Sequence, residues 1–148
     1  MNIFGIFGKN EDWQIRFISN AICKAMFGLP VTLRQNRKFS YLYIDDLMPV
    51  LEFFIENDVK HKSYNVVPDQ SVELADIANL IKKITSSNVE INIANAGLGL
   101  DYTGNNERLK SEMRRLKFTS IQDSAAELYR YYKKNINIIK KELLLEDK

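Results

Sequence analysis

The chain has 148 residues, of which 45% are hydrophobic and 27% charged, and its formal net charge at pH 7 is +2. This length and composition are typical of one globular domain with its own core. The charge is too small to indicate a nucleic-acid-binding protein. No apolar run approaches the roughly 20 residues of a membrane-spanning helix, and the N-terminus does not resemble a signal peptide. We therefore expect a cytoplasmic protein that binds neither nucleic acid nor membrane.

The periodicity of apolar residues, with turn residues between the periodic segments, predicts alternating strands and helices. Strands are expected over residues 2–7, 31–34, 39–44, 63–67 and 89–93. Helices are expected over residues 13–27, 47–57, 72–85, 106–115, 121–133 and 136–146. This order favours an α/β fold with few, mainly parallel strands and several helices. We expect one domain over residues 1–148, with a peripheral terminal helix within 135–148.

The stretch from Arg37 to Asn57 joins a strand to a helix, and we expect the rest of the chain to cover it. Asp45 and Asp46 end the strand and are expected to cap the helix, because carboxylates accept hydrogen bonds from free N–H groups and suit the positive end of the helix dipole. Pro49 falls in or just after the first turn, where its missing N–H costs little. The predicted buried face of this helix consists of Leu47, Val50, Leu51, Phe54 and Ile55.

Polar residues mark the expected beginnings of the later helices. Ser71 is expected to cap the helix over 72–85, and Asn105 the short helix that follows the glycine-rich segment. Thr119 lies three residues before Gln122, a spacing that predicts a capping box.

Three other segments are interpreted from turn residues and alternation. Gln35-Asn36 is a candidate turn. Residues 95–104 contain three of the six glycines and predict a mobile loop. The strand over 89–93 alternates apolar with polar residues, so we expect an edge strand with one face in water.

Cysteine and histidine each occur once, as Cys23 and His61. One cysteine forms no internal disulfide, and one residue of each kind makes neither a zinc cluster nor a convincing Cys–His nucleophile pair. Cys23 falls on a probable core helix, which predicts a buried thiol. His61 lies in a lysine-rich turn, and we expect no catalytic role for it.

Several different short motifs follow one another along the chain in a recognisable order. Phe39 to Leu47 is similar to R-D-F-x-Y-V-D-D-L, and Phe4 to Gly8 is similar to F-N-x-Y-G. These motifs belong to the NAD(P)-dependent nucleotide-sugar epimerase/dehydratase family, the extended short-chain dehydrogenase/reductases. The chain resembles the C-terminal, substrate-binding half of this family up to about Asn135. Weaker similarities fall at residues 17–28, 64–66 (Y-N-V-G), 72–75 (S-x-x-E-L-A), 105–109 (D-x-S-K) and 118–119.

The chain also departs from the family. The glycine-rich turn that seats the dinucleotide pyrophosphate is absent, and so is the catalytic Tyr-x-x-x-Lys; Tyr129 and Lys133 have that spacing but lie in a late helix. Gly5 stands where many members carry a substrate-contacting Asn, and Phe39 where many carry a phosphate-binding Arg. Residues 97–104 contain no match to the family's later Arg. Arg37 or Lys38 is the candidate replacement for the first Arg.

The resemblance therefore implies a fragment: the substrate-binding part of an enzyme acting on a nucleotide-diphosphate sugar, not catalytically competent alone. NAD(P) is the parent enzyme's cofactor by resemblance, and we expect this chain alone to bind none. Its expected partners are the N-terminal Rossmann half and the nucleotide sugar, whose diphosphate requires cations and whose base requires flat faces. No residue is predicted to be catalytic. The candidate substrate-binding residues are Asn10, Trp13, Arg16, Gln35, Arg37 and Arg108.

Two alternatives remain open. The chain could be a non-enzymatic binding or oligomerisation module, in which the strand edge at residues 2–7 pairs with another copy. This alternative predicts self-association and no affinity for nucleotide sugars. An unrelated small α/β enzyme is the other, but no group in the sequence supplies its active site.

Overall fold

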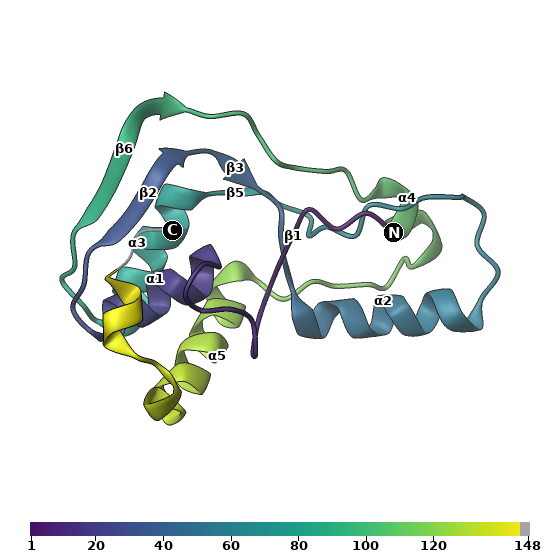
Figure 1. Cartoon of the computed structure of the whole chain (residues 1–148). Helices are drawn as coiled ribbons and strands as arrows, with labels where there is room; N and C mark the ends of the chain where they lie inside the picture. The colour runs from purple at the N-terminus through teal and green to yellow at the C-terminus, as the bar shows by residue number, and fades with distance from the viewer. Residues whose placement is uncertain (146–148) are drawn as a thin grey trace.

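The chain forms a broad lobe and a narrow lobe (Figure 1), in a computed structural model that describes residues 1–145. The broad lobe contains α1 (Phe17–Met26), β2 (Val31–Asn36), α3 (Leu74–Thr85), β6 (Ile91–Leu98) and α5 (Ile121–Lys134). The narrow lobe contains α2 (Ile44–Glu56), α4 (Glu107–Glu112) and the N-terminal segment that leads into β1 (Gly5–Phe7). Short strands connect the lobes: β3 (Lys38–Phe39), β4 (Tyr41–Tyr43) and β5 (Val72–Glu73).

The strands pair in twos. β1 pairs in parallel with β4, and β2 pairs in parallel with β6, with Val31 opposite Ile91. β3 and β5 are antiparallel, with Phe39 opposite Val72. The predicted α/β fold with mainly parallel strands is therefore confirmed.

Each lobe has its own hydrophobic core. In the broad lobe α1, α3 and α5 bury one face each against one another and β2, and Ile22, Ile81 and Leu128 are fully buried there. The narrow lobe buries a smaller cluster that includes Leu42, Val50 and others from its loops. The predicted burial of Cys23 is confirmed, and burial raises the pKa of its thiol to about 12.

Helix α2 begins earlier than predicted. It starts at Ile44, so Asp45 and Asp46 lie inside its first turn, and no side chain caps it. Asp46 instead accepts hydrogen bonds from the Thr119 N–H at 2.8 Å and hydroxyl at 2.7 Å, so the prediction that Asp45 and Asp46 cap the helix was wrong. Pro49 consequently lies in the second turn. Ile55 is 82% exposed, although it was predicted to be buried.

The prediction also misplaced the beginnings of two other helices and the capping residue of a third. The helix expected from residue 13 begins at Phe17, because Asp12 forms a separate turn in which its carbonyl accepts from Arg16 N–H at 2.9 Å. Ser71 caps nothing, because residues 72–73 are strand β5. At α5 the side-chain cap is Ser120, one residue after the predicted Thr119. The predicted helix over 136–146 is two 3₁₀ turns, Ile136–Ile138 and Lys141–Leu144, and residue 146 lies outside the described range.

Three strand predictions need correction as well. β2 continues through Gln35 and Asn36, and β6 continues to Leu98, because the two strands stay paired past a bulge. The expected turn at 35–36 and the first part of the expected loop at 95–104 are therefore strand. Residues 63–67 pair only through a bridge between Asn65 and Asn2. The edge position of β6 is confirmed, since β2 is its only partner strand in residues 1–145. Over this range no helix is long and apolar enough to cross a membrane.

Candidate functional site

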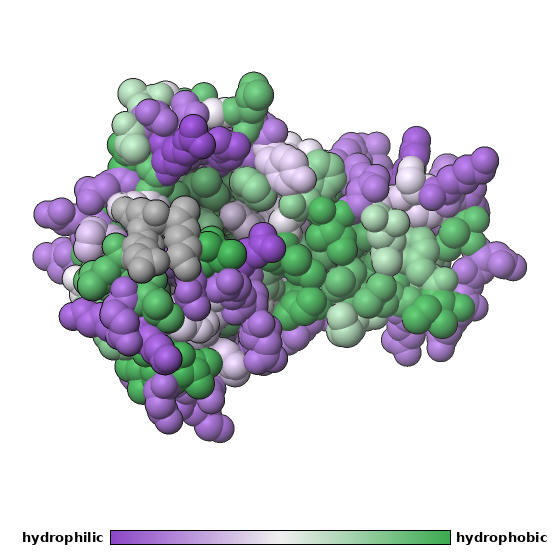
Figure 2. Space-filling view, viewed as in Figure 1, coloured by the Kyte–Doolittle hydropathy of each residue, from purple (hydrophilic) through white to green (hydrophobic). Residues whose placement is uncertain are grey.

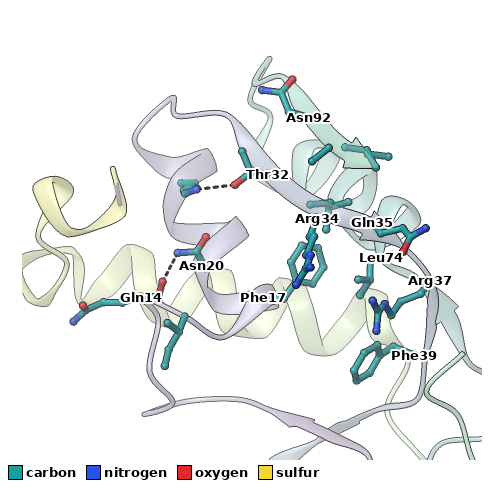
Figure 3. A pocket seen from close by; sticks show the side chains of 15 residues that line it. Gln14, Phe17, Asn20, Thr32, Arg34, Gln35, Arg37, Phe39, Leu74 and Asn92 are labelled. Atoms are coloured by element: carbon teal, nitrogen blue, oxygen red, sulfur yellow. Dashed lines mark hydrogen bonds between the residues drawn. The ribbon is translucent and has the colours of Figure 1, made fainter. Parts of the chain in front are cut away.

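A cavity of about 590 Å³ lies between α1, β2 and β6 in the broad lobe (Figure 3). One side of α1 supplies Phe17, Asn20 and Lys24, whose spacing of three and four residues puts them on one face of the helix. The last part of β2 and the residues just after it supply Arg34, Gln35 and Arg37. The far wall comes from residues 92–94 of β6.

Hydrogen bonds fix the α1 side of this cavity. Lys24 is only 5% exposed, and its ammonium donates to the Thr32 hydroxyl at 3.1 Å. Asn20 donates from its amide to the carbonyl of Gln14 at 2.9 Å. Because these contacts join the helix to its neighbouring strand and loop, this wall is held in place before any ligand arrives.

The described wall of the cavity carries cationic side chains. Lys24, Arg34 and Arg37 line it, and no carboxylate is among its described lining residues. Figure 3 shows Arg34 near Phe17 and Arg37 near Phe39. Within residues 1–145, neither guanidinium has an ion pair or a hydrogen bond. Arginine forks match the oxygens of phosphates and carboxylates, so this wall is suited to an anion.

Of the six predicted binding residues, two line the cavity and four lie elsewhere. Gln35 and Arg37 line the cavity. Asn10 accepts a hydrogen bond from the Tyr131 hydroxyl at 2.9 Å, which ties the loop after β1 to α5. Trp13 packs against the broad-lobe core, and Arg16 is the residue before α1. Arg108 lies on α4 in the narrow lobe.

Sequence reasoning missed the residues that α1 contributes, as well as Arg34. Arg34 was predicted to lie on a strand, but the sequence did not show which elements its side chain would face. Phe17, Asn20 and Lys24 share a helical face, and that pattern was the available signal.

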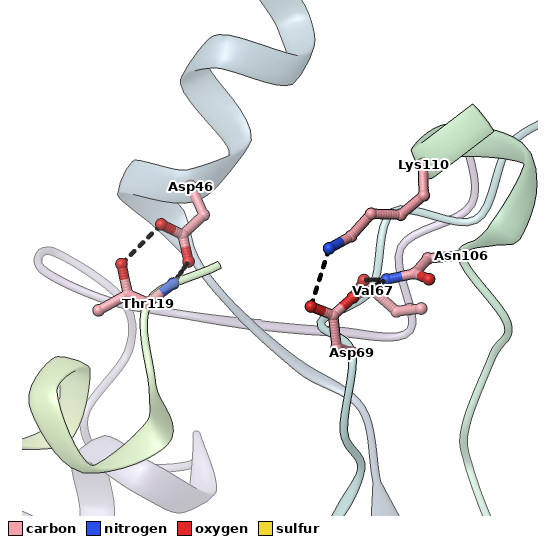
Figure 4. A network of polar contacts seen from close by, with 6 residues as sticks. All are labelled: Asp46, Val67, Asp69, Asn106, Lys110 and Thr119. Atoms are coloured by element: carbon pink, nitrogen blue, oxygen red, sulfur yellow. Dashed lines mark hydrogen bonds and ion pairs between the residues drawn. The ribbon is translucent and has the colours of Figure 1, made fainter. Parts of the chain in front are cut away.

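Aspartates in and near the narrow lobe connect its segments (Figure 4). Asp46 accepts the two hydrogen bonds from Thr119 described above. Asp69 accepts from Lys110 at 2.8 Å and from the Asn106 amide at 2.9 Å, and these contacts, Lys110 first, lower its pKa. Asn106 also donates to the carbonyl of Val67 at 2.9 Å. The bonding partners of these two carboxylates indicate a structural role.

Other reactive groups lie in structural surroundings. His61 packs against Tyr64 in the narrow lobe. Tyr129 and Lys133 contact each other on α5, with the ammonium 5.8 Å from the ring centroid. Residues 1–145 contain no group of three His, Cys, Asp or Glu side chains that could hold a metal ion.

The junction between β1 and α1 lacks the features of a dinucleotide-binding turn. In a dinucleotide fold, a strand leads through a tight glycine-rich turn into a helix whose N-terminus faces the pyrophosphate. Here residues 8–16 separate β1 from α1. Gly8 is the only glycine among them, and a Cβ at that position would meet the Ile44 side chain at 2.2 Å. This glycine therefore accommodates a neighbouring side chain, and the junction offers no pyrophosphate cradle.

Comparison with known proteins gives matches among solved structures. No family model matches the sequence, and no curated protein matches it. The WbmF enzyme of Bordetella bronchiseptica, in complex with NAD⁺ and UDP, superposes with a TM-score of 0.75 at 19% identity over 96% of this chain and 46% of its own. UDP-glucose 4-epimerase of Thermotoga maritima, with UDP-glucose, gives 0.74 at 14% over 89% of this chain and 44% of its own. A GDP-L-fucose synthetase of Naegleria fowleri gives 0.72 at 12%, covering 92% and 45%.

The chain has part of the nucleotide-sugar epimerase fold. It spans less than half the length of each of these enzymes. At such low identity the likeness establishes the epimerase-like fold and leaves the ligand to be argued from the cavity.

Proposed function

We propose that this chain is the substrate-binding part of an NAD(P)-dependent enzyme that epimerises, dehydrates or reduces a nucleotide-diphosphate sugar. One observation carries the proposal: Arg34 and Arg37 line a cavity of about 590 Å³ that has no described carboxylate in its wall. This volume is within the range of small-molecule sites, roughly 300–1,000 Å³. The arginines would hold the diphosphate, and the Phe17 ring offers a flat face for the base.

The proposal includes a second polypeptide portion that carries NAD(P) and the acid–base groups. The chain spans less than half the length of the solved structures compared above, and its β1–α1 junction has no dinucleotide-binding turn. The narrow lobe exposes large hydrophobic side chains, and Figure 2 shows hydrophobic surface over β1 and part of α2. We give the name apolar face to the exposed large hydrophobic residues of α2, β1 and the segment before β1, which are Met1, Ile3, Ile6, Met48 and Ile55. We propose that the cofactor-binding half covers this face.

Calorimetric titration of the chain with UDP and with GDP tests the ligand. Arg37→Ala and Arg34→Ala are each expected to weaken binding about tenfold or more, because each removes charge-assisted hydrogen bonds. Arg114→Ala, at an exposed position after α4, is the matched control and should leave affinity unchanged. Absence of binding by the folded wild-type chain, or equal effects of all three substitutions, would contradict the proposal.

The apolar face also favours a second candidate function, a binding or assembly module. Exposed hydrophobic surface of this kind often marks a protein–protein contact. Light scattering with and without a nucleotide sugar separates the candidates. Self-association that a nucleotide sugar does not change, without binding of the sugar, favours the assembly module. Binding of the nucleotide sugar favours the substrate-binding part of an enzyme.

A further inference from the structure

Four aromatic rings meet beside the Arg37 end of the cavity. The Phe39 ring stacks on Tyr41 with centroids 4.7 Å apart and planes 20° apart. The Tyr102 ring lies 5.0 Å from Phe39 and 5.3 Å from Phe4. Phe39 also lines the cavity, so the cluster continues its wall. We call these four residues the aromatic cluster.

Backbone contacts hold the cluster in place. The Tyr102 N–H donates to the Lys38 carbonyl at 2.9 Å, and the Ser40 N–H donates to the Tyr102 carbonyl at 3.1 Å. The segment carrying Tyr102 is thereby fixed alongside β3. These bonds belong to the main chain, so a change of the Tyr102 side chain leaves them available.

Two glycines give the rings their room. A Cβ at Gly5 would lie 3.1 Å from the Phe39 ring and 3.2 Å from the Tyr41 ring. A Cβ at Gly104 would lie 2.7 Å from the Phe4 ring. Larger residues at these positions would displace the rings, so the observed packing of the cluster requires glycine at both positions.

The cluster is not simply part of the buried core. Phe7 and Tyr43, which lie nearby, are each 3% exposed, whereas Tyr102 is 47% exposed. The Tyr102 side chain is thus open to solvent near the Arg37 end of the cavity.

We infer that the aromatic cluster is a subsite for the sugar ring, which stacks on the exposed Tyr102 ring that Phe39 supports, and that this stacking contributes to selection of nucleotide sugars over nucleotide diphosphates. This inference rests on the proposed function. Arg37 and Phe39 are two residues apart along an extended segment, about 7 Å, so a sugar attached to a phosphate at Arg37 can reach the rings. The C–H groups on one face of a sugar are apolar and slightly positive, and they suit the negative face of an aromatic ring.

The test compares each diphosphate with its sugar derivative by calorimetric titration: UDP with UDP-glucose, and GDP with GDP-mannose. For the pair whose diphosphate binds, Tyr102→Ala is expected to weaken binding of the nucleotide sugar about three- to tenfold and that of the diphosphate less than about twofold. Tyr102→Phe keeps the ring and should retain both affinities. Leu100→Ala, an exposed position on the same segment, is the matched control and should change neither.

A second measurement does not depend on a variant. In the wild-type chain the aromatic ring current should shift the sugar C–H resonances upfield in the proton spectrum on binding. If the diphosphate binds but Tyr102→Ala affects both members of the pair equally, or neither, the sugar subsite is wrong and the proposed function stands. If neither a diphosphate nor a nucleotide sugar binds, both are wrong.

Discussion

The two lobes differ in how they use their apolar residues. In the broad lobe three helices cover one another and β2, and fully buried residues such as Ile22 and Ile81 leave a polar, cationic cavity beside the core. In the narrow lobe the buried cluster is smaller, while Met48 is 50% exposed and Ile55 is 82% exposed. The broad lobe also exposes Ile15, Ile93 and Leu98, so the lobes differ in the size of their buried clusters rather than in whether they expose apolar residues. The exposed residues of the narrow lobe are the ones that, in the function proposed above, another polypeptide covers.

The largest effect should come from a cavity in the broad-lobe core. Ile81→Ala removes a fully buried side chain and is expected to lower the free energy of unfolding by about 2–5 kcal/mol. Urea denaturation measures this change. Ile55→Ala, on the exposed side of α2, is the matched control and should change stability by less than about 0.5 kcal/mol. Similar losses from both would show that the narrow lobe buries its helix as fully as the broad lobe does.

A smaller effect is expected where the lobes are joined. Asp46→Ala removes both hydrogen bonds from Thr119, which lies just before α5. We expect a loss of about 1 kcal/mol in the free energy of unfolding, measured in urea. Asp45→Ala is the control. The Asp45 carboxylate lies 4.0 Å from the Lys9 ammonium, so removing it should lower the free energy of unfolding by less. An equal cost for both would mean that the Thr119 contacts do not stabilise the junction.

Two carboxyl groups should give opposite dependences of stability on pH. Burial raises the pKa of Glu11 above 4.5 and outweighs the hydrogen bond from Ser19, so its contribution is fully present below pH 4.5 and is lost as pH rises through the folded pKa. Lys110 lowers the pKa of Asp69 below 3.8, so its contribution is present above pH 3.8 and is lost as pH falls through the folded pKa.

Denaturation of Glu11→Gln and Asp69→Asn between pH 3 and pH 7 measures the two dependences. Relative to wild type, Glu11→Gln should become more stable as pH rises, since the Gln amide oxygen can still accept from Ser19. Asp69→Asn should become less stable over the same rise. Parallel curves for the two variants would contradict this assignment.

The smallest effect on stability is expected at the apolar face. Met48→Lys and Ile6→Lys should leave the free energy of unfolding within about 0.5 kcal/mol of wild type. If the face drives association of the chain, both should lower the mass measured by light scattering at high concentration. Ile15→Lys places the same change on an exposed residue at the cavity side of the broad lobe and should not affect the mass. Equal masses for all variants of an associated chain would exclude this face as its contact.

Local patterns predicted some features of the molecule and not others. Apolar periodicity predicted the helix over residues 72–85, and Ile77 and Ile81, four residues apart, are both buried on α3. The start of α2 was misjudged, because Asp46 has a partner 73 residues away in Thr119, and no local pattern reveals it. Ile55 has helical spacing but no covering element. Periodicity shows that a face is apolar without showing what covers it.

The candidate site was predicted in part for a similar reason. Arg37 was expected to bind substrate from its place beside the predicted strand over residues 39–44, and it lines the cavity. Arg34 and Lys24 come together there only because β2 lies beside α1, which is a property of the tertiary fold. The aromatic cluster likewise depends on Tyr102 lying 63 residues beyond Phe39 in the sequence and next to it in space.

Asn36 joins the cavity wall to the following helix. Its amide oxygen accepts from the Ala75 N–H at 3.0 Å, its amide nitrogen donates to Glu73 at 2.8 Å, and the neighbouring Arg37 carbonyl accepts from the Leu74 N–H at 3.1 Å. The end of β2 and the beginning of α3 are thus coupled, and Arg37 is attached to a rigid frame. Because that frame is preorganised, a ligand would lose little affinity to ordering the backbone around it.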